Sequence, residues 1–123
     1  MMNLLLVSGT FLSGLGVALG AFGAHYLKSR LSQEMLAIFE VGVRYQIYHS
    51  LALCLLGILT LHYANSYLNY AGASFLFGIL LFSGSLYALA LSGIKAFGAI
   101  TPIGGVLFLL GWGLFMIGSL PRG

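Results

Sequence analysis

The stretch that decides the fold is residues 4–24, LLLVSGTFLSGLGVALGAFGA, which contains no charged residue. A helix needs about 20 consecutive apolar residues to cross a hydrocarbon core of about 30 Å. Residues 4–24 reach that length. The first Lys or Arg is Lys28, so the segment lacks the basic start of a secretory signal. The sequence therefore predicts a retained first transmembrane span, with a cleaved signal as the alternative.

The composition of the whole chain also indicates a membrane environment. Of its 123 residues, 60% are hydrophobic and only 6% are charged, whereas about 25% of the residues of a soluble domain are charged. So few charges cannot cover the surface of a soluble fold of this size. The five basic residues are scattered along the chain rather than clustered. These numbers exclude a soluble enzyme and a nucleic-acid-binding protein, and they predict an integral membrane protein.

Three further spans are expected over residues 45–63, 70–91 and 102–120. Residues 33–44 form an amphipathic segment before the second span, and the pattern leaves open whether helix 2 is continuous or bent near Gly42. Four spans leave no room for a soluble module. We therefore predict a single all-α transmembrane domain over residues 1–123, with four helices in a tight left-handed bundle and a long second helix that starts at the membrane interface.

Four residues mark expected helix ends. Ser32 is a good N-cap for helix 2, and Thr101 is a good N-cap for the last helix, with Pro102 at the first helical position. Gly93 is expected at the C-terminal end of the third helix.

The basic residues predict an orientation. With four spans, the connections 1–2 and 3–4 share a side, and the basic residues assigned to that side are Lys28, Arg30, Arg44 and Lys95. The other side carries only Arg122. The positive-inside rule then places these two connections in the cytoplasm and both termini outside.

Small residues recur at steps of three and four along three of the spans. Lipid is as apolar as leucine, so membrane helices associate through small residues that let their backbones approach. The candidate packing positions are Gly9, Ser13, Gly16, Gly20, Gly23, Gly78, Ser85, Gly104, Gly111 and Gly118. These rows hold the bundle together, or one of them contacts another copy of the chain, so a homo-oligomer is expected.

Polar groups that could carry chemistry are few and gather near the start of the second span. The candidate polar cluster consists of Glu40, Arg44, Tyr45, Gln46, Tyr48, His49 and His25. Glu40 and Arg44 are four residues apart, with the acid first, which is the favourable order for a helical ion pair. The cluster is either an interfacial anchor or a polar pocket between helices.

His25 and His49 raise a further possibility, because facing helices could present both imidazoles to a haem iron or a quinone. No carboxylate completes a metal site beside them, and Cys54 is a lone cysteine. No nucleophile, base and orienting group occur together. We therefore expect no catalytic residue, no metal site and no cofactor.

Four segments carry a family resemblance: GAFGAH at residues 20–25, YQIYHSLAL at 45–53, GSLY at 84–87 and GAITPIGG at 98–105. In this order they resemble the small bacterial YgdD/YwdK-type membrane proteins, catalogued as domain of unknown function 423, and the similar eukaryotic transmembrane protein 256 group. Ser50 stands where alanine is common in that family. The resemblance implies a multi-span protein of the bacterial inner membrane and supplies no activity, substrate or catalytic residue.

The leading functional hypothesis is a non-enzymatic structural or accessory membrane subunit that acts through helix–helix packing. Its expected partners are the lipid bilayer and either a second copy or a larger membrane complex, with no nucleic acid. The alternative is a small-solute or proton-coupled transporter or channel that uses Glu40, Arg44, Tyr45 and His49. The second alternative is the haem- or quinone-binding protein with His25 and His49.

Overall fold

The computed structural model describes residues 2–121, and these residues form helices joined by short connections. The elements in chain order are α1 (Leu4–His25), the 3₁₀ turn η1 (Leu27–Ser29), α2 (Gln33–Leu59), α3 (Ser66–Ser92), the 3₁₀ turn η2 (Lys95–Ala99) and α4 (Thr101–Ser119).

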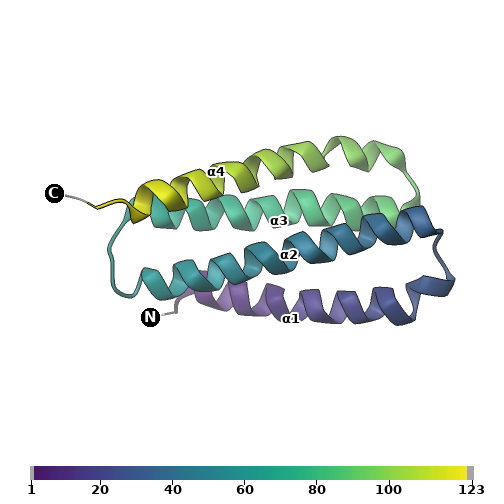
Figure 1. The fold of residues 1–123 in the computed structure, drawn as a ribbon, viewed down its shortest axis with the longest axis horizontal. Coiled ribbons are helices and arrows are strands. Elements are labelled where there is room, and N and C mark those ends of the chain that lie inside the picture. Colours follow the sequence, from purple (N-terminus) through teal and green to yellow (C-terminus); the bar gives the residue numbers. More distant parts are fainter. Residues whose placement is uncertain (1, 122–123) are drawn as a thin grey trace.

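The four long helices run side by side and alternate in direction (Figure 1). The α1–α2 and α3–α4 connections lie at one end of the molecule. The α2–α3 connection, the start of α1 and the end of α4 lie at the other. This arrangement places η1 and η2 at the same end.

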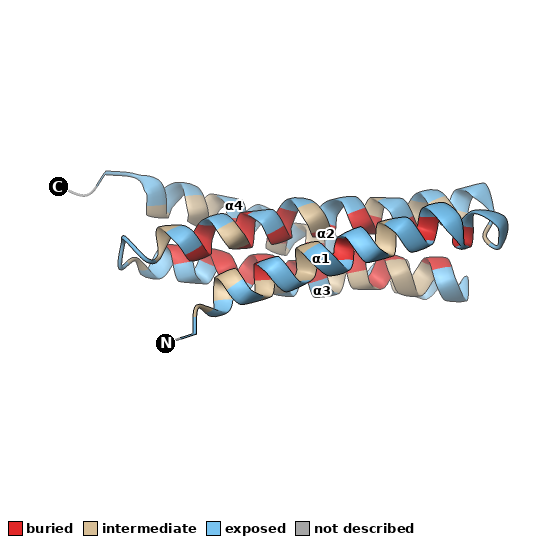
Figure 2. Ribbon diagram, turned by 90° about the horizontal axis from the view of Figure 1, so that it is seen from below, coloured by how far each residue is buried: buried red, intermediate tan, exposed pale blue. Residues whose placement is uncertain are grey.

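The helices follow chain order in space. The extensive interfaces within residues 2–121 are α1 with α2, α2 with α3, and α3 with α4, whereas α1 and α4 share no interface of that extent. The central helices α2 and α3 are therefore the most buried, and α1 and α4 present exposed outer faces (Figure 2). These faces are apolar; they carry Phe11 and Val17 on α1 and Val106 and Leu109 on α4.

Within residues 2–121, three segments are long and apolar enough to cross a membrane, namely Leu4–Ser29, Ser66–Ser92 and Lys95–Ser119. α2 is not among them, although its 27 residues equal those of α3 and reach about 40 Å. Its middle contains the polar residues Gln46, His49 and Ser50, which lower its hydropathy and are all buried inside the molecule.

α2 is continuous through Gly42, so the structure shows no break where the sequence left a bend open. The Ser32 side chain caps it as predicted, by accepting a hydrogen bond from the Met35 N–H at 3.2 Å. α2 ends at Leu59 and α3 begins at Ser66, so the connection starts and ends about four residues earlier than expected. The Asn65 side chain fixes the earlier start of α3, because it accepts from the Tyr67 N–H at 2.9 Å.

The predicted N-cap role of Thr101 is wrong. Thr101 is the first residue of α4, and no side chain caps this helix because η2 leads directly into it. The Thr101 hydroxyl instead lies 2.5 Å from the Ser85 hydroxyl on α3. The expected glycine at the end of α3 is present: Gly93 has a φ of 73°, in the left-handed region that glycine adopts without strain.

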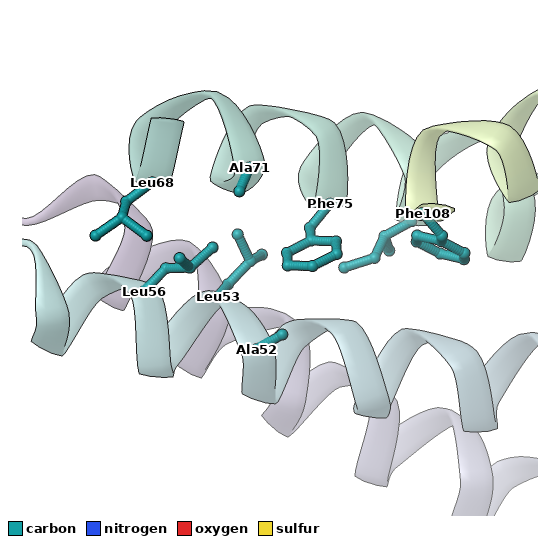
Figure 3. Packing of buried hydrophobic residues seen from close by; sticks show 8 residues of the cluster. Ala52, Leu53, Leu56, Leu68, Ala71, Phe75 and Phe108 are labelled. Carbon is teal, nitrogen blue, oxygen red and sulfur yellow. The ribbon is translucent and has the colours of Figure 1, made fainter. Parts of the chain in front are cut away.

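The larger apolar core lies where α2, α3 and α4 meet (Figure 3). Its buried members are Ala52, Leu53, Leu56, Leu68, Ala71, Phe75, Ile79 and Phe108. The phenyl rings pack over glycines: a Cβ added at Gly111 would lie 2.6 Å from the Phe75 ring, and one added at Gly78 would lie 2.6 Å from the Phe108 ring. α3 and α4 can approach closely because these glycines carry no side chain.

Candidate functional site

Gln46 lies in the middle of α2 and connects its two neighbours. Its side chain is 2% exposed. The Nε2 group donates to the Leu12 carbonyl of α1 at 2.8 Å, and Oε1 accepts from the Tyr87 hydroxyl of α3 at 2.6 Å. One buried amide therefore bonds three helices.

Buried serines add bonds of the same kind. The Ser50 hydroxyl of α2 lies 2.9 Å from the Ser13 hydroxyl of α1. The Ser83 hydroxyl of α3 donates to the Gly42 carbonyl of α2 at 2.6 Å. Within residues 2–121, no buried side-chain nitrogen or oxygen is without a hydrogen-bond partner. In an apolar medium an unpaired polar group is costly, so these bonds stabilise the helix arrangement.

His49 faces α4, and both of its ring nitrogens are bonded. The Trp112 indole N–H, which can only donate, points at Nε2 at 3.1 Å. Nε2 is therefore the acceptor, and Nδ1 carries the proton that it donates to the Tyr45 carbonyl at 2.7 Å. The imidazole also stacks on Phe108, with ring centroids 3.6 Å apart and an interplanar angle of 4°. The geometry fixes a neutral imidazole in one orientation.

Beside this imidazole, α2 and α4 enclose a groove of about 480 Å³, which we call the aromatic groove. It is lined by Tyr45, Tyr48, His49, Gly105, Phe108, Leu109 and Trp112. Tyr48 and Trp112 are exposed along it, at 52% and 45%, so the groove opens sideways, away from the molecule. None of its lining residues is charged.

The predicted polar cluster is divided between two sides of α2. Glu40 and Arg44 are exposed and line a separate groove of about 340 Å³ against Gly20 and Gly23 of α1. Tyr45, Tyr48 and His49 line the aromatic groove instead, and Gln46 is buried between the helices. The seven candidates therefore do not form one pocket.

His25 and His49 are not brought together. His25 is exposed at the end of α1. Gly23, two residues before it, lies against Phe39 of α2, which is ten residues, or about 15 Å, along α2 from His49. Both His49 nitrogens are already bonded, so the predicted haem pair has no support in the geometry.

The predicted small residues lie at two helix interfaces. Cβ atoms added at Gly9, Gly16, Gly20 and Gly23 of α1 would contact α2, at Cys54, Ile47, Val43 and Phe39. Gly78 and Ser85 of α3 and Gly104, Gly111 and Gly118 of α4 lie between these two helices. A Cβ at Gly104 would be 2.7 Å from the Phe82 Cα. Ser13 faces α2 through its bond to Ser50.

Sequence reasoning missed other contact residues of the central helices. A Cβ at Gly42 would lie 2.8 Å from the Tyr87 ring, and one at Gly57 would lie 2.7 Å from the Leu6 nitrogen. Trp112 was also missed. A usable signal existed, because it is the only tryptophan of the chain and stands in mid-span, whereas membrane tryptophans concentrate at the interfaces.

Comparison with known proteins finds relatives of the same length. Residues 19–105 match the family described as "Protein of unknown function (DUF423)". A UPF0382 membrane protein of Staphylococcus saprophyticus is 44% identical over 118 residues, which cover 96% of this chain and 98% of that protein. UPF0382 membrane proteins of Staphylococcus epidermidis and Staphylococcus aureus are 43% and 42% identical, over 97% and 96% of both chains. No solved structure matches the chain.

Proposed function

The chain belongs to the DUF423 family, and its relatives in Staphylococcus are named membrane proteins; from that premise we propose that it is a four-span, non-enzymatic accessory protein of the bacterial inner membrane. It acts through helix–helix packing. One observation carries this proposal: the polar side chains of α2 bond to α1, α3 and α4. Groups that a catalyst or carrier would keep free are used here to hold helices together.

A membrane crossing by α2 is supported by the direction of its side chains. Gln46, His49 and Ser50 point inward and are bonded, whereas Leu51 and Leu55 are exposed on its outer face. Polar groups must be satisfied internally within lipid, and the buried polar side chains of α2 meet this condition while the helix lies between α1 and α3. Three of the residues that lower its hydropathy, Gln46, His49 and Ser50, are buried inside the molecule.

The proposed orientation is inferred from the basic residues at the end of the molecule where η1 and η2 lie. Lys28, Arg30 and Lys95 lie at that end, so we place it in the cytoplasm. Arg122, the basic residue assigned to the opposite side, lies outside the described residues.

The proposed partner is a second copy that packs on the outer face of α1. α1 is the least buried of the three candidate spans, with 11% of its apolar window buried. Thr10, Gly14 and Ala18 form a row of exposed small residues at intervals of four, and nothing lies within 4 Å of a Cβ added at Gly14. Rows with this spacing let two membrane helices approach closely.

Disulfide crosslinking in membranes tests this partner. In a Cys54→Ser background, Ala18→Cys should give a disulfide-linked dimer, whereas Val106→Cys on the outer face of α4 should not. Adding Gly14→Leu should abolish the Ala18→Cys dimer. Gly113→Leu is the matched control, because its added Cβ also meets nothing within 4 Å. Equal crosslinking at positions 18 and 106, or a dimer that survives Gly14→Leu, would reject the α1 interface.

A second candidate function is a proton-coupled or small-solute pathway. The observation in its favour is that Glu40 and Arg44 line one groove between α1 and α2. If that groove conducts, Glu40→Gln should abolish flux into proteoliposomes while leaving the protein folded. Normal flux in Glu40→Gln would eliminate this pathway.

A further inference from the structure

The groove between α1 and α2 carries two opposite charges that are not paired with each other. Glu40 and Arg44 are four residues apart on α2, both are exposed, and both line this groove of about 340 Å³. Their spacing favours an ion pair, but within residues 2–121 neither side chain forms an ion pair or a hydrogen bond. The Glu40 carboxylate and the Arg44 guanidinium are therefore available to a molecule that enters the groove.

The two charges lie at different depths below the end of the molecule where η1 lies. A Cβ added at Gly23 of α1 would lie 3.1 Å from the Phe39 ring, and α1 ends two residues later, at His25. Glu40 follows Phe39, so it lies close to this end, and Arg44 lies one helical turn, or about 6 Å, deeper. The headgroup layer on each side of a bilayer is about 5–8 Å thick. The two charges therefore span one headgroup layer.

Beyond Arg44, the same face of α2 is apolar. Ile47 lines the groove, and Leu51, seven residues after Arg44 and thus on the same face, is 52% exposed. On the α1 side the groove is lined by Gly20 and Gly23, which carry no side chain to fill it. A molecule that matches this surface has a charged end toward η1 and an apolar chain toward the middle of the membrane.

The order of the charges restricts the headgroup. In a phospholipid the phosphate lies next to the acyl chains, and the headgroup amine, where there is one, lies farther toward water. Arg44, the deeper residue, can donate to the phosphate, and Glu40, one turn nearer to water, can accept from a primary ammonium group. A trimethylated ammonium group has no N–H to donate, and a glycerol headgroup carries no cation for Glu40.

We propose that the groove between α1 and α2 binds an aminophospholipid, a phospholipid whose headgroup carries a primary ammonium group. The Arg44 guanidinium donates to the phosphate, the Glu40 carboxylate accepts from the ammonium group, and one acyl chain lies along Ile47 and Leu51. The site rests on the proposed crossing of α2, which cysteine labelling of the connections tests separately. It requires neither the association through α1 nor a flux through the groove.

Native mass spectrometry of the full-length protein measures this preference. Protein purified in detergent is titrated with phosphatidylethanolamine, phosphatidylcholine or phosphatidylglycerol, each with the same palmitoyl and oleoyl chains. We expect a saturable site for phosphatidylethanolamine, with affinities for the other two lipids about 10-fold lower, the effect of one charge-assisted hydrogen bond. Equal affinities for the three lipids, or tighter binding of either of the others, overturn the proposal, and this comparison needs no variant to fold.

Single substitutions assign the preference to the groove. Glu40→Gln should abolish the preference for phosphatidylethanolamine over phosphatidylcholine. Glu34→Gln, in the exposed first turn of α2, is the matched control and should retain it. Arg44→Gln should weaken the binding of all three lipids, because all three carry the phosphate, whereas Arg30→Gln in the α1–α2 connection should not. A preference that survives Glu40→Gln overturns the proposal.

The double variant Glu40→Arg/Arg44→Glu tests the order of the charges, because it keeps both charges and reverses their positions along α2. We expect it to lose the preference for phosphatidylethanolamine, and a retained preference overturns the proposal. Loss of flux in Glu40→Gln with an unchanged lipid preference would also overturn it, by assigning the groove to the pathway instead. Gly14→Leu should leave the preference intact, which separates this site from the α1 interface.

Discussion

At the scale of single residues, the buried polar side chains of α2 are stabilised in an apolar medium by hydrogen bonds to the neighbouring helices. The amide of Gln46 has an acceptor that takes the Tyr87 hydroxyl and a donor that reaches the Leu12 carbonyl. A leucine of similar size would fill the same space and bond neither. Gln46 therefore provides the acceptor for the Tyr87 hydroxyl and adds a bond from α2 to the backbone of α1.

We expect Gln46→Leu to destabilise the protein by about 1–2 kcal/mol, because it leaves the Tyr87 hydroxyl without a partner and removes the side-chain bond to the Leu12 carbonyl. The free energy of unfolding can be measured by titration with sodium dodecyl sulfate. Gln33→Leu, in the exposed first turn of α2, is the control and should change stability by less than about 0.5 kcal/mol. The double variant Gln46→Leu/Tyr87→Phe should recover part of the loss, and strict additivity would argue against the bond.

The bond between His49 and Trp112 makes a spectroscopic prediction. In His49→Phe the ring stack on Phe108 can persist, but the Trp112 indole N–H loses its acceptor. We therefore expect the emission maximum of Trp112 to move to shorter wavelength. Tyr48→Phe is the control, because the indole N–H of Trp112 donates to His49 and not to the Tyr48 hydroxyl. The emission maximum of Trp112 should be unchanged in this variant. An unshifted maximum in His49→Phe would mean that the imidazole is not the acceptor.

At the scale of helices, the sequence predicted the features that depend on residues close in sequence, such as helix ends. It predicted less well the features that depend on contacts with other helices. The Ser32 cap and the Gly93 helix end follow from local chemistry, and both are present. Thr101 was misassigned because its hydroxyl bonds Ser85 on another helix, and no local pattern contains that partner.

α3 shows the same limit more broadly. Its row through Gly78 and Ser85 was visible as a spacing pattern, but α3 is a central helix with a second contact face toward α2. Ser83, which is fully buried and bonded to the Gly42 carbonyl, belongs to that second face. A periodicity finds one face of a helix, whereas the number of faces in contact depends on where the helix lies in the molecule. The aromatic groove was missed for the same reason, since its walls come from two helices that are far apart in sequence.

Two adjacent glycines near the start of α4, Gly104 and Gly105, differ in how closely they approach α3. Substituting each by alanine therefore distinguishes the effect of helix packing from the effect of helix propensity. A Cβ at Gly104 would lie 2.7 Å from the Phe82 Cα, whereas one at Gly105 meets only the Phe82 side chain, at 3.9 Å. Gly104→Ala must push α3 and α4 apart, and we expect a loss of about 1–3 kcal/mol. Gly105→Ala adds no clash and replaces a glycine within the helix, so it should be neutral or stabilise the protein by up to about 1 kcal/mol. Thermal unfolding of both variants checks this, and equal effects would show that the α3–α4 distance is not set at Gly104.

At the scale of the whole molecule, the open row of helices explains why so much apolar surface faces outward. α1 and α4 lie at the two ends of the row and share no extensive interface with each other, so Phe11, Val17, Val106 and Leu109 remain exposed. In water such faces would drive aggregation, while in lipid they are solvated. Polar side chains such as Gln46 and Ser83 are buried between the helices, and large apolar side chains cover the outer faces. This is the arrangement expected of helices that are surrounded by lipid.

The number of times that the chain crosses the membrane can be determined by cysteine labelling. If all four helices cross, the η1 and η2 connections share one side and the α2–α3 connection lies on the other. In a Cys54→Ser background, Ser29→Cys and Ala96→Cys should react with a membrane-impermeant maleimide only after the inner membrane is permeabilised. Ala64→Cys should react in spheroplasts, without permeabilisation. If α2 instead lay on the surface, its two ends could not be on opposite sides, and Ser29→Cys and Ala64→Cys would be labelled under the same conditions. Labelling of the two ends of α2 from opposite sides would mean that a helix with Gln46, His49 and Ser50 in its middle spans the membrane, with these buried side chains bonded to protein rather than exposed to lipid.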